Sequence, residues 1–95
     1  MKAVWYDRNG DSDVLTYGDL PTPTPGPGEV LVRLATSGVN PSDWKSRRGS
    51  RGMPFPRVIP HSDGAGVIEA VGEGVDTARI GQRAWIWNGQ WKRPF

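Results

Sequence analysis

Residues 29–43 read Glu29-Val-Leu-Val-Arg-Leu-Ala-Thr-Ser-Gly-Val-Asn-Pro-Ser-Asp43 and combine the pattern of a strand with that of a helix start. Residues 29–37 alternate between two sets of apolar side chains and are rich in β-branched types, which predicts a β-strand. A helix then begins, because Asn40 or Ser42 can cap it and Pro41 suits its first turn. The stretch therefore predicts a strand that leads directly into a short helix.

Four further segments have the composition of short strands, namely residues 2–6, 14–19, 64–72 and 81–87. Asn88-Gly89 follows the last of them and predicts a hairpin turn. Residues 21–28 are rich in alternating prolines, so we expect an extended connection outside the sheet ladder. With 13 glycines and 9 prolines, the chain favours strands and turns over helices. We predict a mainly β fold, a partly open β-barrel with one short helix, over residues 1–95.

The composition argues against several classes of function. The chain has no cysteine, which rules out disulfides, thiolate metal sites and cysteine nucleophiles. No stretch approaches the roughly 20 apolar residues that span a bilayer, and the first residues lack the apolar run of a signal peptide. We therefore expect a soluble, cytoplasmic protein that does not act in a membrane.

The net charge is only +2, but basic residues gather in one segment. Aromatic residues are sparse there and no nucleic-acid-binding motif occurs, so we expect no nucleic-acid partner. A solvated loop that helps to attract an anionic cofactor is the favoured interpretation. The basic residues of this segment are Lys45, Arg47, Arg48, Arg51 and Arg57.

Asn40 and Asp43 are the first candidates for chemistry, because a polar cluster at a strand-to-helix junction can face a cleft. Asn40 could exchange hydrogen bonds with an amide or carbonyl ligand, and Asp43 could orient a neighbouring group. The structural interpretation, in which both residues only cap the helix, is favoured on residue type alone.

His61 is the single histidine of the chain. A metal site needs several N, O or S ligands, and His61 with the nearby Asp63 does not supply them, so we expect no metal site. We predict a loop histidine that is hydrogen-bonded to the backbone. Gly64 and Gly66 do not form a dinucleotide fingerprint either, because no helix is predicted directly after them.

Trp85, Trp87 and Trp91 flank the predicted hairpin at the end of the sequence. One interpretation is a core face that further chain covers, and this one is favoured. The alternative is a surface for a protein partner, since tryptophan is enriched at interfaces.

Four motifs occur in one order along the chain. They are Pro27-Gly-Glu-Val-Leu-Val32, Ser37-Gly-Val-Asn-Pro-Ser-Asp43, Pro60-His-Ser-Asp-Gly-Ala-Gly-Val-Ile-Glu-Ala-Val-Gly-Glu-Gly-Val75 and Gly81-Gln-Arg-Ala84. In this order and spacing they closely resemble the N-terminal, GroES-like domain of the medium-chain dehydrogenase/reductase superfamily. The resemblance covers essentially the whole chain.

That superfamily contains zinc alcohol dehydrogenases and zinc-free reductases. In the zinc branch the position of Asn40 is a metal-binding cysteine and that of Ser62 is a metal-binding histidine. Because neither ligand is present, the resemblance implies the zinc-independent NADPH:quinone oxidoreductase branch. His61 replaces a usual glycine, so the loop before Ser62 is expected to differ in shape, and Asp63 matches an acidic position to which we assign a structural role.

The resemblance also implies a mechanism, in which NADPH passes hydride to a quinone or an α,β-unsaturated carbonyl. Asn40 would face the nicotinamide and Asp43 would support that loop, which makes them the catalytic candidates. Lys45 and Arg51 lie at or near positions where many relatives place tyrosines close to the cofactor. With Asn40, they are the candidates for cofactor binding.

In the relatives, a Rossmann domain that binds the cofactor follows the region that this chain resembles. We therefore expect residues 1–95 to be a truncated catalytic domain that is incomplete without the downstream chain and lacks the Rossmann domain. The full-length parent is expected to act on a small-molecule quinone or enone and to form a homo-oligomer.

Two other functions stay open on the sequence. The chain could be a stand-alone binding or assembly module of GroES-like fold without enzymatic activity. A zinc-dependent alcohol dehydrogenase with displaced ligands is the weaker alternative.

Overall fold

The strands of the protein form two antiparallel sheets in the computed structural model, which describes residues 1–93. The smaller sheet pairs β1 (Lys2–Trp5) with β2 (Thr16–Asp19). The larger sheet has the order β3 (Val30–Ser37), β4 (Gly64–Val71) and β5 (Arg83–Ile86). All five predicted strands are therefore present, and the mainly β prediction is confirmed, but the two sheets are open and do not close into a barrel.

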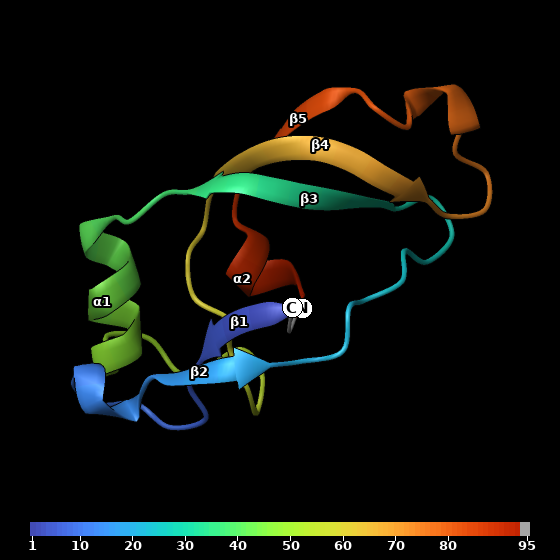
Figure 1. The fold of residues 1–95 in the computed structure, drawn as a ribbon. Helices are drawn as coiled ribbons and strands as arrows, with labels where there is room; N and C mark the ends of the chain where they lie inside the picture. The colour runs from blue at the N-terminus through green and yellow to red at the C-terminus, as the bar shows by residue number, and fades with distance from the viewer. Residues whose placement is uncertain (94–95) are drawn as a thin grey trace.

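The helices are short and lie around the sheets. α1 (Pro41–Arg48) follows β3, as predicted, and single turns of 3-10 helix cover Ser12–Val14 and Thr77–Arg79. Figure 1 shows the larger sheet at the top, the smaller sheet below it, and α2 (Gly89–Lys92) between the two. α2 thus occupies the space that separates the two sheets.

The hairpin predicted at Asn88-Gly89 is wrong, and so is the prediction of a single short helix. Asn88 does adopt the left-handed conformation expected of a turn residue, with φ of 60°. The residues after it turn into α2, and the backbone N–H of Gly89 donates to the carbonyl oxygen of Ser62 at 2.9 Å. A contact with a distant loop therefore replaces the expected strand pairing.

The core beside the smaller sheet is built around Tyr6, which is 1% exposed. Its backbone exchanges two hydrogen bonds with Val58, of 3.0 and 2.9 Å, in an isolated antiparallel bridge. Val14 completes this buried cluster and Met53 packs against it. The bridge anchors the proline-rich loop before β4 to the end of β1 and thereby fixes the position of the residues that lead into β4.

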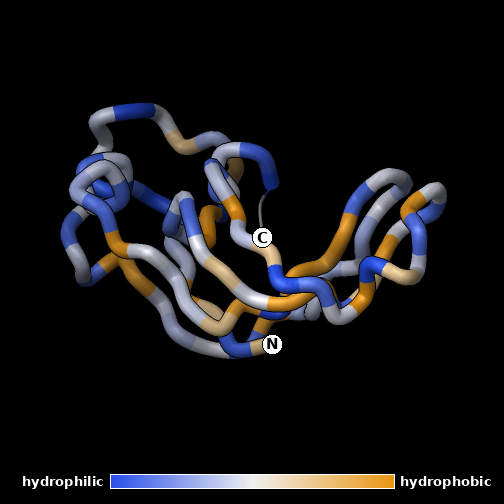
Figure 2. Tube along the Cα trace, turned by 90° about the horizontal axis from the view of Figure 1, so that it is seen from above, coloured by the Kyte–Doolittle hydropathy of each residue, from blue (hydrophilic) through white to orange (hydrophobic). Residues whose placement is uncertain are grey.

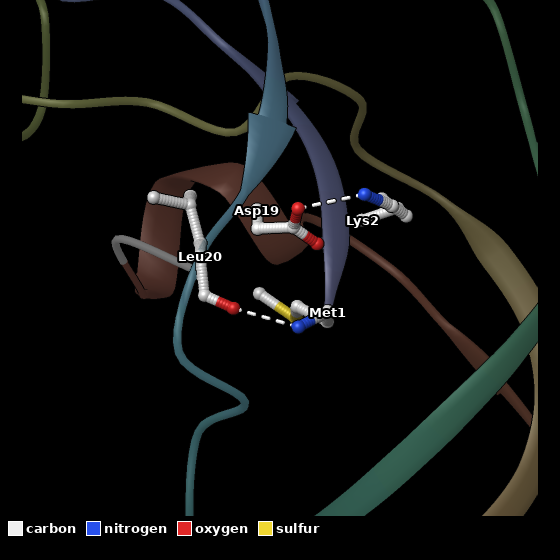
Figure 3. Close-up of polar contacts among 4 residues, drawn as sticks. All are labelled: Met1, Lys2, Asp19 and Leu20. Carbon is white, nitrogen blue, oxygen red and sulfur yellow. Dashed lines mark hydrogen bonds and ion pairs between the residues drawn. The ribbon is translucent and has the colours of Figure 1, made fainter.

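Two contacts fasten the start of the chain to the end of β2, as Figure 3 shows. The Nζ atom of Lys2 lies 2.6 Å from the Oδ2 atom of Asp19, and the terminal ammonium of Met1 donates to the carbonyl oxygen of Leu20 at 2.7 Å. Both contacts are exposed, and exposed ion pairs contribute little to stability. Their effect is to align β1 with β2 where the proline-rich connection begins.

That connection joins the two sheets along one edge of the molecule. It is closed by backbone hydrogen bonds from Gly28 to Glu73 and from Gly72 to Glu29, both of 2.8 Å. A side chain on Gly72 would collide with the carbonyl of Gly26, so the close approach requires glycine there. The predicted extended connection is confirmed, and it holds the turn after β4.

The larger sheet leaves much apolar surface exposed. Ile68 on β4 is buried at 1% exposure, whereas Leu34, Val67 and Trp85 are exposed by 49%, 40% and 76%. Along the chain, hydrophobic stretches are short and alternate with hydrophilic turns (Figure 2). No helix among residues 1–93 is long and apolar enough to cross a membrane.

Ile68 tests how far the fold depends on its buried positions. We expect Ile68→Ala to lower the free energy of unfolding by about 2–5 kcal/mol, because it removes packed methyl groups and leaves a cavity. Urea unfolding followed by circular dichroism measures the change. Ile80→Ala is the matched control, since Ile80 is 50% exposed, and a loss as large as that of Ile68→Ala would contradict this assignment of the core.

Candidate functional site

The site begins at the junction of β3 and α1, where Asn40 is the N-cap of the helix. The backbone N–H of Asn40 donates to the Oδ2 atom of Asp43 at 2.6 Å, and the N–H of Asp43 donates to the carbonyl oxygen of Asn40 at 2.9 Å. Pro41 at the first helical position has no N–H that needs a partner. The predicted helix start is therefore present, with Asp43 as the side chain that caps it. The interpretation that both residues only cap the helix is wrong, because both side chains also bind other segments.

The side chain of Asn40 does not cap its own helix but reaches a second segment. Its Nδ2 atom donates to the Oδ1 atom of Asp63 at 2.5 Å. The backbone N–H of Gly38 donates to the carbonyl oxygen of Asp63 at 2.9 Å, and a side chain on Gly38 would collide with the Asp63 carboxylate. Asp63 thus ties the end of β3 to the start of β4, in line with the structural role predicted for it.

Asp43 is 4% exposed and binds a third segment as well. Its Oδ1 atom accepts hydrogen bonds from Ser62 Oγ at 3.4 Å and from Gln90 Nε2 at 3.2 Å. Gln90 Nε2 also donates to Ser62 Oγ at 3.0 Å. The buried carboxylate therefore joins α1, the loop before β4 and α2 in one network.

Gln90 was not predicted as a site residue, because the sequence pattern placed it in a hairpin. It is 3% exposed, and its Oε1 atom is buried with no hydrogen-bond partner in the described part of the chain. The amide nitrogen has to face Asp43, since a carboxylate only accepts hydrogen bonds. An unsatisfied buried acceptor is unfavourable by about 1–3 kcal/mol. This oxygen is closed to solvent, so it belongs to the buried network and not to a binding surface.

Tyr6 lies close enough to this network for the charge of Asp43 to affect the pKa of its hydroxyl. Burial raises the pKa of its hydroxyl above the ordinary value of 10.0; the Arg47 guanidinium opposes this rise in pKa and the Asp43 carboxylate adds to it. Tyr6 is therefore a neutral hydroxyl at physiological pH.

His61 occupies an unusual backbone conformation, with φ of 93°. Its Nδ1 atom lies 2.8 Å from the Oγ atom of Ser37, at the end of β3. The predicted hydrogen bond to the backbone is therefore wrong, because the loop turns the imidazole toward a side chain. Residues other than glycine rarely adopt such a φ, and the conformation is unfavourable by about 1–3 kcal/mol.

An open cavity of about 290 Å³ lies beside the polar cluster. Ser37 and Asp63 line it together with Trp85, whose exposed indole forms an apolar wall. A second hollow, of about 490 Å³, follows the proline-rich connection past Leu20 and Arg57. Only the first is adjacent to the hydrogen bonds of Asn40, Asp63 and His61, so it is the candidate binding site.

Lys45 and Arg51, the other predicted site residues, lie apart from these hydrogen bonds. The Nζ atom of Lys45 is 5.6 Å from the ring centroid of Trp44, and the guanidinium of Arg51 is 5.4 Å from that of Trp91. Within residues 1–93 neither side chain is hydrogen-bonded to Asn40 or Asp43. The structure brings Asn40 and Asp43 together and leaves the two cations on neighbouring aromatic faces.

No three histidine, cysteine, aspartate or glutamate side chains gather into a group that could hold a metal ion in the described part of the chain. The residue pattern Gly64-Ala-Gly66 forms the first part of β4, not a turn that opens a helix. The site is thus a network of amide, hydroxyl and carboxylate groups beside an open cavity.

An open β fold with a short helix after its third strand, and a polar cluster at that junction, defines the catalytic-domain type of the medium-chain dehydrogenases and reductases. Comparison with known families agrees, because the Alcohol dehydrogenase GroES-like domain matches residues 26–92. The chain belongs to this family, and its fold is the GroES-like domain of medium-chain dehydrogenase/reductase-type oxidoreductases.

Curated relatives include alcohol dehydrogenase from Moraxella sp., 38% identical over 92 residues, with coverage of 93% of this chain and 27% of that protein. The chloroplastic quinone-oxidoreductase QR1 of Triphysaria versicolor is 36% identical over 87 residues, which cover 87% of this chain and 26% of that protein. The human synaptic vesicle membrane protein VAT-1 homolog is 43% identical over 74 residues, with coverage of 74% and 19%. The chain thus spans a fifth to a quarter of the length of these relatives.

Solved structures show the same fold. A mycobacterial protein complexed with NADPH superimposes with a TM-score of 0.80 at 32% identity, over 96% of this chain and 29% of that one. A mycobacterial quinone oxidoreductase superimposes with a TM-score of 0.78 at 34% identity, and the match covers 95% of this chain and 29% of that one.

Asp43 is the residue whose loss should disturb the site most. We expect Asp43→Ala to lower the free energy of unfolding by about 2–4 kcal/mol, because a helix cap and two further charge-assisted contacts disappear together. Thermal unfolding of the purified chain measures it. Asp11→Ala is the control: among residues 1–93 this carboxylate pairs with Arg48 alone and is 76% exposed, so its loss should change stability by less than about 1 kcal/mol. Equal effects of the two substitutions would refute the network.

A pair of substitutions at His61 separates backbone strain from the contact of the ring. His61→Ala and His61→Gly both delete the imidazole, but only glycine relieves a φ of 93°. We expect the glycine variant to be more stable than the alanine variant by about 1 kcal/mol. Urea unfolding of the two variants side by side gives this difference, and equal midpoints would show that the strain is absent.

Proposed function

We propose that the full-length protein is an NADPH-dependent reductase of quinones or α,β-unsaturated carbonyls that works without zinc. In this proposal residues 1–95 form the catalytic domain and a nucleotide-binding domain lies elsewhere in the protein. Membership of the GroES-like family and the likeness to quinone oxidoreductases support the reaction class.

The observation that carries the proposal is the hydrogen bonding of Asn40 and Ser62. These two residues stand where the zinc branch is expected to have its cysteine and histidine ligands. Here the Asn40 amide donates to Asp63 and the Ser62 hydroxyl donates to Asp43. Amide and hydroxyl groups are poor ligands for Zn²⁺, which prefers thiolate and imidazole, so the pair supports a zinc-free site.

The residues of this chain fit a nicotinamide cofactor at the edge of the site. When bound, NADPH supplies the hydride for the reduction. Asn40 is the proposed partner of the nicotinamide carboxamide, and its contacts with Asp43 and Asp63 would hold it in place. Lys45 and Arg51 are exposed cations that would attract its phosphates.

The cavity beside Trp85 suits the second reactant. An exposed indole offers a face on which a flat quinone or enone can stack, and the Ser37 hydroxyl can donate a hydrogen bond to a carbonyl oxygen. A planar, carbonyl-bearing substrate therefore matches both walls of the cavity. The larger of these walls is apolar, which favours hydrophobic substrates.

A binding or assembly module is the second candidate, because Trp85 and Trp87 are 76% and 67% exposed. Exposed tryptophans are favourable anchors for a protein partner. Light scattering on the purified chain tests this function, and a monomer at all concentrations would argue against self-assembly through this face.

An NADPH titration followed by nucleotide fluorescence tests the proposed enzyme. We expect the full-length protein to bind NADPH and residues 1–95 alone to bind it far more weakly. In the full-length protein, Lys45→Ala and Arg51→Ala should each weaken binding about tenfold, as the loss of one charge-assisted contact does. Lys2→Ala, on the edge of the smaller sheet, is the control; tight binding by residues 1–95 alone would overturn this assignment.

A further inference from the structure

His61 has no role in the proposed function so far, although it contacts the Ser37 hydroxyl that is proposed to meet the substrate. His61 Nδ1 is 2.8 Å from Ser37 Oγ, and Ser37 lines the cavity of about 290 Å³. The ring is half-buried while the hydroxyl is exposed. The imidazole therefore lies one hydrogen bond behind the hydroxyl that faces the cavity.

The backbone conformation that places the His61 imidazole next to Ser37 is strained and lowers the stability of the fold. A φ of 93° at His61 is unfavourable for any residue with a side chain. Strained conformations persist where the surrounding structure fixes them, and they gather at functional sites. Here Pro60 precedes the residue, and Ser62 is bound on both sides by Asp43 and Gln90. The ring is thus clamped against Ser37 by its neighbours in sequence.

We propose that Ser37 and His61 form a proton relay that serves a carbonyl substrate in the cavity beside Trp85. This inference rests on the proposed reduction of quinones or α,β-unsaturated carbonyls. Ser37 is the catalytic residue, because its hydroxyl meets the substrate. His61 is a positioning and proton-supplying residue that acts through Ser37.

The chemistry balances with one hydride and one proton. Hydride transfer to the β-carbon of the substrate breaks the carbon–carbon π bond and leaves an enolate oxygen with a negative charge. The Ser37 Oγ–H bond breaks as its proton moves to that oxygen, and Ser37 Oγ takes the proton from Nδ1 of the His61 imidazolium. Neutral His61 keeps its proton on Nε2, and Nδ1 is protonated again from water through Ser37 Oγ once the product has left the cavity. For a quinone, the same proton reaches the oxygen of the reduced ring.

A hydroxyl suits this role because it donates one hydrogen while it accepts another. Asp63, the charged residue that shares the cavity with Ser37, already accepts a hydrogen bond from Asn40 and carries a backbone contact with Gly38. A carboxylate so engaged is a poor proton donor. The imidazole is the side chain best suited to exchange protons at neutral pH.

The test uses steady-state kinetics of the full-length protein with NADPH and an enone or a benzoquinone. His61→Gly removes the relay and suits the backbone conformation, so it should fold. We expect its kcat to fall about 100-fold, within the range of general acid–base effects, with KM and the Kd of NADPH nearly unchanged. Added imidazole should restore part of kcat in proportion to its concentration, and pyrrole, which lacks the basic nitrogen, should not.

Two further variants complete the experiment. Ser37→Ala should lower kcat to a similar degree, and the double variant should be no slower than either single one, because the two residues act as a unit. Ser50→Ala, at an exposed serine in the loop after α1, is the matched control and should keep the rate of the unsubstituted protein.

The outcomes separate the relay from the reaction that it serves. An active full-length protein whose His61→Gly variant keeps its kcat, or loses it without recovery in imidazole, overturns the relay alone. A full-length protein that binds NADPH but reduces neither quinones nor enones overturns the proposed function and the relay with it. Selective loss of kcat with recovery in imidazole supports both.

Discussion

The buried carboxylate of Asp43 is the contact on which the rest of the site depends. One of its oxygens caps the helix that follows β3, and the other binds Ser62 and Gln90. A buried charge is tolerated only where hydrogen bonds replace its lost hydration. Because its partners come from three segments that are distant in sequence, satisfying one carboxylate fixes the relative positions of α1, the loop before β4 and α2.

The loop held in this way carries Asp63, which lines the cavity, and His61, which contacts the cavity-lining Ser37. Ser62 is fixed by Asp43, and on either side of it Asp63 receives the Asn40 amide while His61 turns to Ser37. A chain of only short helices and open sheets thus presents an ordered polar surface, although much of its larger sheet is exposed. Of the exposed apolar side chains of that sheet, Trp85 lines the cavity, where its indole suits a flat, hydrophobic ligand.

Several features could be read from the sequence because their causes are local. Alternation predicted the strands, and the Asn-Pro-Ser-Asp pattern predicted the start of α1, with Asn40 or Ser42 as its cap. The prediction failed at Asn88-Gly89, where the left-handed Asn88 was read as a hairpin. A turn residue shows only that the chain bends. The path of the residues after Asn88 is set by their hydrogen bonds to the Ser62 carbonyl and to Asp43, and no local sequence pattern reveals these contacts. Gln90 was missed for that reason.

The sequence alone determined the family, the order of strands and helix, and the residue types at the junction after β3, because propensity, capping and motif spacing act over a few neighbouring residues. Only the tertiary structure decided that Asp43 would bind Gln90, that Asn40 would pair with Asp63, and that His61 would meet Ser37. Such contacts depend on how open sheets and short helices are oriented, and this orientation is set by buried hydrogen bonds between segments far apart in the chain.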